Sequence, residues 1–280
     1  MSDGTSTPTL ARTDDTLRLA VTGATGQMGK AVLNAASDRG DLSVVLRVNR
    51  DPATEDSGDS PRRIEPAADL PGLLNERGPH VLVDFSGPDS AIEYADACAE
   101  SGVAFVTGTT GFDDAQLERL HEIGERIPLL HATNFSRGIE ALSGALADVL
   151  GALPGYDIEL TETHHNRKRD APSGTASTLL DWIEASRENQ TDAGSKEGMN
   201  ERTYGRGRTQ PRVEGEIGVH VRRAGDIRGE HEILFAGNDE VLSLTHRAES
   251  RAVFAAGALD AARWVADREP VTYDFEEVLA

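Results

Sequence analysis

The sequence lacks several features by which whole classes of protein are recognised. Its 280 residues include one cysteine, Cys98, which excludes an internal disulfide and a metal site built on cysteine. No apolar run approaches the ~20 residues that a membrane-spanning helix needs. Residues 1–16 contain no apolar segment of the kind that a secretory signal requires, and their Ser, Thr and Asp content is typical of a disordered tail. We therefore expect a cytoplasmic protein.

Lysine is also scarce, and the chain is strongly acidic. There are 48 Asp and Glu residues against 28 Lys and Arg residues, which gives a formal net charge of -20. The only lysines are Lys30, Lys168 and Lys196. Phosphate backbones would repel such a chain, so nucleic-acid binding is not expected. An acidic surface with arginine in place of lysine favours a halophilic protein, kept soluble at high salt.

Short apolar runs alternate with helical stretches through the first half of the chain. The runs are bounded by Gly, Pro or polar residues, and they span 17–23, 42–50, 80–86, 103–108 and 127–133. Strands that alternate with helices indicate a parallel sheet with helices on both faces. The sequence therefore predicts an α/β fold, a Rossmann-type doubly wound parallel sheet, over residues 17–136.

The pattern changes after residue 136. Helices are expected over 137–150 and 174–186, and the polar, aperiodic stretch 187–212 is expected to be a long loop. Three strand-like runs follow at 216–225, 229–237 and 240–248. Because tight turns join these runs, they predict antiparallel pairing.

The second half is thus expected to be an α+β domain, residues 137–249, with an open mixed sheet. A final helix within 250–280 is expected to pack back on the first domain.

A glycine-rich stretch joins the first expected strand to the first expected helix. In "VTGATGQMGKAV", Gly23, Gly26 and Gly29 would let the backbone turn tightly and let a pyrophosphate approach the helix N-terminus. The spacing is G-x-x-G-x-x-G and not G-x-G-x-x-G, so an ordinary strand–helix turn is the alternative. The position after the first strand of a βαβ unit favours a dinucleotide.

The end of the second expected strand bears on the choice of dinucleotide. An acidic residue there binds the ribose 2′-OH of NAD, whereas an arginine suits the 2′-phosphate of NADP. The strand ends in Asn49 and Arg50, followed by Asp51. Arg50 favours NADP, the alternative being a solvated strand end. NADPH is therefore the expected cofactor, with NADH possible.

The segment "THHNRKRDAPSGTAS", residues 163–177, concentrates basic residues in this acidic chain. Pro172 and Ser173 form a helix start in which Ser173 is a natural cap, so the N–H groups of Gly174 and Thr175 are left to bind a carboxylate or phosphate. Two imidazoles and a lysine lie just upstream, and such groups transfer protons near neutral pH. The segment predicts anion binding with proton transfer. A polar turn with satisfied histidines is the alternative, and no residue spacing supports a metal site.

The chain resembles the 4-hydroxy-tetrahydrodipicolinate reductase (dihydrodipicolinate reductase) family. The family hallmark, E-x-H-H-x-x-K-x-D-A-P-S-G-T-A, stands here as residues 162–176. Further matches lie at 23–29, 108–112, 132–138, 222–237 and 244–259. The resemblance implies NAD(P)H-dependent reduction of 4-hydroxy-tetrahydrodipicolinate to tetrahydrodipicolinate, with loss of water, in lysine biosynthesis through diaminopimelate.

The resemblance also implies residue roles. It makes His164 the proton donor and acceptor and Lys168 the second proton donor. Its substrate-binding residues are His165, Ser173, Gly174 and Thr175. Its cofactor-binding residues are Gly23, Ala24, Thr25, Gly26, Gln27 and Met28 at the pyrophosphate, Asn49 and Arg50 at the adenosine ribose, Gly108, Thr109 and Thr110 at the nicotinamide ribose, and Ala132, Thr133, Asn134 and Phe135 along the nicotinamide. Many members carry an acidic residue at the Asn49 position and accept both cofactors, so Asn49 favours NADP.

The expected partners are a small-molecule dicarboxylate and further copies of the chain. The resemblance and the strand-rich second half predict a homotetramer formed through sheet pairing, with residues 137–249 as the substrate-binding and oligomerisation domain. Neither a nucleic acid nor a membrane is expected as a partner. Two other functions stay open, another two-domain NADP oxidoreductase and a nucleotide-sensing protein that binds NADP without turnover.

Overall fold

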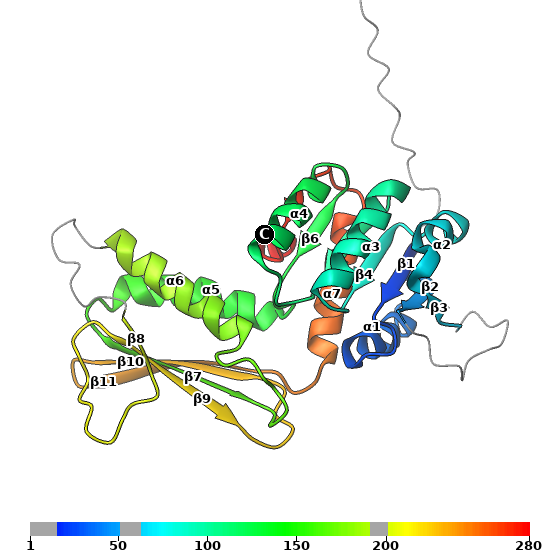
Figure 1. The fold of residues 1–280 in the computed structure, drawn as a ribbon. Helices are drawn as coiled ribbons and strands as arrows, with labels where there is room; N and C mark the ends of the chain where they lie inside the picture. Colours follow the sequence, from blue (N-terminus) through cyan, green and yellow to red (C-terminus); the bar gives the residue numbers. More distant parts are fainter. Residues whose placement is uncertain (1–15, 51–62, 191–200) are drawn as a thin grey trace, which may run out of the picture.

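The computed structural model describes residues 16–50, 63–190 and 201–280. Nearly all of the expected tail lies outside these residues, as do Asp51 and residues 191–200 of the expected long loop. The chain forms two lobes, each a sheet with helices packed on it (Figure 1). Within the described ranges, no helix is long and apolar enough to cross a membrane.

The first lobe is built on a seven-stranded sheet in which every assigned strand pair is parallel. The strands are β1 (Leu17–Thr22), β2 (Leu42–Asn49), β3 (Glu65–Pro66), β4 (Val81–Asp84), β5 (Ala104–Thr107), β6 (Leu129–His131) and β12 (Thr272–Tyr273). Their order is β12-β6-β5-β4-β1-β2-β3. The chain runs outward from β1 to β2 on one side and to β4 on the other, and ligands bind at such a switch point. The predicted doubly wound sheet is confirmed.

Helices cover both faces of this sheet, which explains why its central strands are apolar. One face packs on α1 (Gln27–Ser37) and α7 (Ala252–Val265), and the other on α2 (Leu70–Arg77), α3 (Pro88–Ser101) and α4 (Asp114–Gly124). The short helices η1 (Ala67–Asp69) and α8 (Glu276–Leu279) complete the lobe. Most buried residues of α7 are alanine or glycine, and a Cβ on Gly257 would lie 1.9 Å from the carbonyl oxygen of Phe135. This close approach packs the C-terminal helix on the first lobe.

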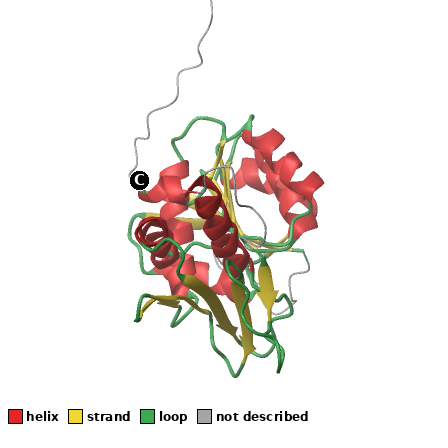
Figure 2. Ribbon diagram, turned by 90° about the vertical axis from the view of Figure 1, so that its left-hand side faces the viewer, coloured by secondary structure: helices red, strands yellow, loops and turns green. Residues whose placement is uncertain are grey.

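The second lobe is a five-stranded mixed sheet in the order β11-β10-β7-β9-β8. Its strands are β7 (Asp157–His164), β8 (Arg202–Tyr204), β9 (Ile217–Arg223), β10 (Glu230–Gly237) and β11 (Glu240–Arg247). Helices α5 (Arg137–Ala152) and α6 (Gly174–Gln190) lie across one face, as Figures 1 and 2 show from two sides. Alternate residues of the strands, such as Ile233 and Phe235, are buried against these helices. The expected open mixed sheet is confirmed.

Two expectations for this lobe need correction. The antiparallel pairing is confirmed for β10 with β11, but it is wrong for β9, which pairs in parallel with β7 and β8. The central strand β7 inserts between β9 and β10, and the local turn signal carried no information on this distant partner.

The expected loop over 187–212 is also partly wrong, because α6 continues to Gln190 and β8 forms within it. Contacts outside the local pattern explain the difference. Arg187 donates to the carbonyl oxygens of Tyr156 and Gly215. Arg202 of β8 pairs with Glu184 of α6 at 2.5 Å. These contacts stabilise regular structure in a stretch without hydrophobic periodicity.

Candidate active site

The glycine-rich stretch forms a tight turn between β1 and α1. Gly23 has a φ of +64°, and a Cβ there would lie 2.4 Å from the carbonyl oxygen of Phe85. A Cβ on Gly29 would lie 2.1 Å from the carbonyl oxygen of Gly23. Gly26 is the N-cap of α1 and has no side chain. The first amides of the helix therefore receive no hydrogen bond acceptor from the capping residue's side chain. The turn and the helix end have the form that receives a pyrophosphate.

A buried carboxylate holds the neighbouring loop in place. Asp84, at the end of β4, accepts hydrogen bonds from the hydroxyls of Thr22, Thr107 and Thr109 at 2.7, 2.9 and 2.7 Å. The side chain of Thr109 therefore points inward, and Thr110 is exposed. Sequence reasoning missed Asp84, although a threonine closes two of the neighbouring apolar strands.

The two residues expected at the adenosine ribose lie at the end of β2. Asn49 is half-buried and Arg50 is exposed. The guanidinium of Arg50 lies 3.6 Å from a carboxylate oxygen of Glu93 on α3. Arg50 is therefore at the surface, where a phosphate would compete with Glu93 for it.

A cavity of about 230 Å³ lies between the two lobes. It brings together nine of the residues expected from the sequence, from both halves of the chain: Met28, Gly108, Thr133, Asn134, Phe135, His164, His165, Lys168 and Thr175. The ring of Phe135 itself packs inward, with its centroid 5.9 Å from that of Phe85 and 5.2 Å from that of Phe275. The other expected residues do not line this cavity: Gly23, Ala24, Thr25, Gly26, Gln27, Asn49, Arg50, Thr109, Thr110, Ala132, Ser173 and Gly174.

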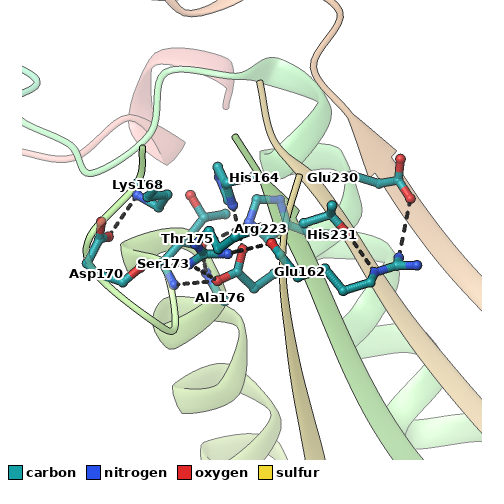
Figure 3. A network of polar contacts seen from close by, with 12 residues as sticks. Glu162, His164, Lys168, Asp170, Ser173, Thr175, Ala176, Arg223, Glu230 and His231 are labelled. Carbon is teal, nitrogen blue, oxygen red and sulfur yellow. Dashed lines mark hydrogen bonds and ion pairs between the residues drawn. The ribbon is translucent and has the colours of Figure 1, made fainter. Parts of the chain in front are cut away.

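His164 and Glu162 form a close pair at the end of β7 (Figure 3). The Nδ1 atom of His164 lies 2.5 Å from Oε2 of Glu162, whose side chain is fully buried. Burial opposes ionisation of Glu162, but hydrogen bonds from His164 and Arg223 outweigh it and hold the pKa of Glu162 at about 2. Because an ionised carboxylate only accepts hydrogen bonds, Nδ1 must carry the proton. Nε2, beside Gly229 in the cavity wall, is the nitrogen left for a ligand.

The start of α6 has the cap that the sequence predicts. The Ser173 hydroxyl accepts a hydrogen bond from the Ala176 amide at 3.2 Å, and it lies 3.1 Å from Nε2 of His231. Ser173 is buried, so its polar groups are engaged inside the protein. No acceptor is assigned in the described part of the chain to the amides of Gly174 and Thr175 at the first turn. Those amides have the form of an anion site.

One contact ties this helix end to the first lobe. The side-chain amide of Asn134 donates to the Thr175 hydroxyl at 2.9 Å. Asn134 follows β6, and Thr175 belongs to α6, so the expected nicotinamide segment and the expected carboxylate site meet directly.

Several cationic groups face the same cavity. Lys168 pairs with Asp170 at 2.7 Å (Figure 3). Arg228 and Arg251 line the wall, and neither guanidinium has an ion pair or hydrogen bond among residues 16–50, 63–190 and 201–280. Burial lowers the pKa of His165, and nearby cations, including Arg251, add to the effect. The wall therefore presents positive charge that an anionic ligand would offset.

Two further histidines in the wall are neutral. Burial lowers the pKa of His231 to about 3, with the nearby His164 adding to the effect. Burial also lowers the pKa of His246, whose Nε2 lies 3.0 Å from the Ser136 hydroxyl. These rings contribute polarity and shape but no charge at neutral pH.

Sequence reasoning assigned no role to seven residues of this region: Asp84, Glu162, Arg223, Arg228, His231, His246 and Arg251. Most of them lie within the motifs quoted above, yet their partners come from distant segments. The available signal was the clustering of polar residues at the ends of expected strands.

The comparisons with known proteins identify the family to which the chain is similar. The family model for the dihydrodipicolinate reductase N-terminus matches residues 17–135, and that for the C-terminus matches residues 138–279. The 4-hydroxy-tetrahydrodipicolinate reductase of Haloarcula marismortui is 50% identical over 262 residues, covering 94% of this chain and 98% of the relative. That of Natronomonas pharaonis is 48% identical over 264 residues, covering 94% and 100%.

Solved structures share the fold. Dipicolinate-bound dihydrodipicolinate reductase from Paenisporosarcina sp. TG-14 has a TM-score of 0.72 at 24% identity, covering 94% of this chain and 99% of that one. The DAP dehydrogenase of C. glutamicum has a TM-score of 0.54 at 13% identity, covering 95% and 96%. At these identities the likeness is one of architecture.

Proposed function

Because the chain belongs to the dihydrodipicolinate reductase family, we propose that it reduces 4-hydroxy-tetrahydrodipicolinate to tetrahydrodipicolinate with NAD(P)H. The 4-hydroxyl leaves as water, and one proton is consumed for each hydride transferred. The reaction belongs to lysine biosynthesis through diaminopimelate. The observation that carries the proposal is the cavity where the expected nicotinamide segment meets His164, Lys168 and the start of α6.

The first lobe fits a dinucleotide. A Cβ at Gly23 or Gly29 would strike backbone, so the turn leaves room only for hydrogen beside a pyrophosphate. We assign the pyrophosphate to residues 23–28, the nicotinamide ribose to residues 108–110 and the nicotinamide to residues 132–135. The cofactor supplies the hydride. The chain's contribution is to orient the substrate, oppose its charge and move protons.

The second lobe fits a dicarboxylate. The Gly174 and Thr175 amides hold one carboxylate at the positive end of α6. Neutral His165 donates a further hydrogen bond, and Arg228 and Arg251 oppose the remaining negative charge. In an acidic chain, a cavity wall with cationic side chains that form no ion pair within the described residues is suited to an anion.

Two groups are proposed to move protons. Nε2 of His164 faces the cavity, while Nδ1 is held by Glu162. Lys168 lines the same cavity, and its Nζ pairs with Asp170. A hydroxyl leaves as water only when it receives a proton, so His164 acts as donor and acceptor, and Lys168 as the second donor.

The cofactor preference, the salt adaptation, the location and the roles of the two lobes are also proposed. NADPH is preferred over NADH, because Arg50 and not an acidic residue follows Asn49 at the end of β2. The net charge of -20 supports a halophilic enzyme, and a cytoplasmic location is proposed as well. Residues 17–136 with the C-terminal helix bind the dinucleotide. Residues 137–249 bind substrate and form the oligomer.

The oligomer is proposed to be a homotetramer formed through sheet pairing. The edge strand β11 exposes Val241 and Leu242, at 64% and 38%, and an open edge with apolar residues is suited to a second copy. Light scattering should give four times the 30.0 kDa chain mass. A monomeric mass at working concentration would reject the tetramer.

Turnover by purified protein tests the function. NADPH should be consumed when the cyclic substrate, made in situ by the preceding aldolase, is present, and not with amino acids or aldehydes. Dipicolinate, the ligand of the related structure, should compete with the substrate. Tight NADPH binding without consumption would favour a nucleotide sensor, and consumption only with other substrates would favour a different oxidoreductase.

A further inference from the structure

Glu162 lies where three segments of the second lobe meet (Figure 3). It belongs to β7, and its donors come from His164 on the same strand, Arg223 at the end of β9 and Ser173 just before α6. Its side chain is fully buried and does not line the cavity. Glu162 therefore cannot touch a substrate held there.

Both oxygens of Glu162 are saturated. Oε2 accepts from His164 Nδ1 at 2.5 Å and from Arg223 at 3.0 Å. Oε1 accepts from the Ser173 amide at 3.1 Å and from Arg223 at 2.7 Å. The guanidinium of Arg223 also donates to the carbonyl oxygen of Asp170 at 2.6 Å. A buried charge needs such compensation, and Arg223 supplies the opposite charge.

These contacts join the proton-transfer group to the anion site. One oxygen fixes the proton on Nδ1 of His164, and thereby the direction of Nε2. The other oxygen holds the amide that precedes Gly174 and Thr175. We propose that Glu162 is a positioning residue that sets the tautomer of His164 and the start of α6 together. This role rests on the proposed function, because it acts through His164 and through the carboxylate site.

The substitution Glu162→Gln distinguishes a positioning role of Glu162 from a packing role. Gln has the same shape, but one oxygen becomes an NH₂ group, which donates and cannot accept. If the NH₂ group replaces Oε2, Nδ1 of His164 must accept, and its proton moves to Nε2. If it replaces Oε1, the Ser173 amide loses its acceptor. In either orientation the NH₂ group faces the guanidinium of Arg223, and both groups are hydrogen-bond donors.

The test is a double-mutant cycle on kcat, with KM for the substrate and a thermal midpoint recorded for each variant. The variants are Glu162→Gln, His164→Ala and the two combined. The matched control is Glu216→Gln, because Glu216 is also buried and paired with an arginine, Arg206, at 2.5 Å, yet lies outside the cavity. Glu162→Asp, which keeps the charge but shortens the reach, replaces Glu162→Gln if that variant does not fold.

Glu162→Gln should lower kcat roughly 10- to 100-fold. This loss is a part of the rate enhancement of about 10²- to 10⁴-fold that acid–base assistance supplies. In the His164→Ala background the same change should alter kcat by no more than about twofold, because groups that act as a unit are not additive. Glu216→Gln should leave kcat unchanged even if its thermal midpoint falls.

Two results would overturn the positioning role. One is an equal loss from Glu162→Gln in both backgrounds, and the other is an equal loss in the Glu216→Gln control. In either case an impaired His164→Ala would still support the proposed function. Wild-type turnover in His164→Ala would instead remove His164 from the reaction, and with it the route by which Glu162 acts.

Discussion

Glu140→Gln is expected to raise the free energy of unfolding at pH 7.5, and the gain should disappear under acid conditions. Glu140 lies in the first turn of α5 and is half-buried in a second cavity, which shares lining residues with the proposed active site. Asp274 and Glu276 line the same cavity. Burial raises the pKa of Glu140 to about 6, and Glu276 and Asp274 add to the effect. The folded protein therefore binds a proton at Glu140 more tightly than the unfolded chain does.

The sign and size follow from linkage. Below pH 4.5 the carboxyl is protonated in both states, so it does not change the free energy of unfolding. As the pH rises through 6, the folded state must carry a disfavoured charge, so stability falls. A pKa of about 6 against the usual 4.5 corresponds to about 2 kcal/mol. Because Glu140 is only half-buried, solvent screening reduces the expected effect to about 1 kcal/mol.

Urea unfolding followed by circular dichroism, at pH 7.5 and in steps down to pH 5, measures the effect. The gain from Glu140→Gln should be largest at pH 7.5 and shrink steadily below pH 6. It should also shrink in molar salt, which screens the repulsion from Asp274 and Glu276. Glu118→Gln, at an exposed position on α4, controls for the change in overall charge. A gain that is the same at every pH, or a loss at pH 7.5, would refute the reasoning.

Two arginines give further predictions. Arg50→Ala should raise KM for NADPH about tenfold. This change corresponds to the low end of the free energies of hydrogen bonds to charged groups, because Arg50 is exposed and shared with Glu93. KM for NADH should hardly change, and equal changes for the two cofactors would contradict the assignment. Arg251→Ala should raise KM for the dicarboxylate also about tenfold, less so in molar salt. An unchanged KM for substrate at low salt would remove Arg251 from the carboxylate site.

Features encoded in a short stretch could be predicted from the sequence. Five strands of the first sheet, β1, β2, β4, β5 and β6, are apolar runs separated by helices, and the helix start at Ser173 has its own cap signal. The glycine turn is partly local, since Gly29 approaches the backbone of Gly23, whereas the partner of Gly23 is the carbonyl oxygen of Phe85 after β4. Local patterns were therefore sufficient for the main strands of the first lobe, for the glycine-rich turn and for the helix start at Ser173, whereas the individual residue roles came from the family resemblance.

Features that depend on distant partners could not be predicted. The place of β9 is set by β7, about sixty residues earlier in the chain, and not by the turn that leads to β10. Glu162 stands in the quoted hallmark, but its importance appears only when Arg223 and Ser173 are brought to it. Likewise, Arg50 finds Glu93 across the surface of the lobe.

The central claim is that His164 and Lys168 transfer protons to a dicarboxylate held against the nicotinamide. The most direct measurement is kcat for NADPH oxidation in His164→Ala and Lys168→Ala, with NADPH affinity determined separately by fluorescence titration. Each variant should lose about 10²–10⁴ in kcat while its affinity for NADPH is unchanged. Near-normal turnover in either variant would contradict the role given to that residue.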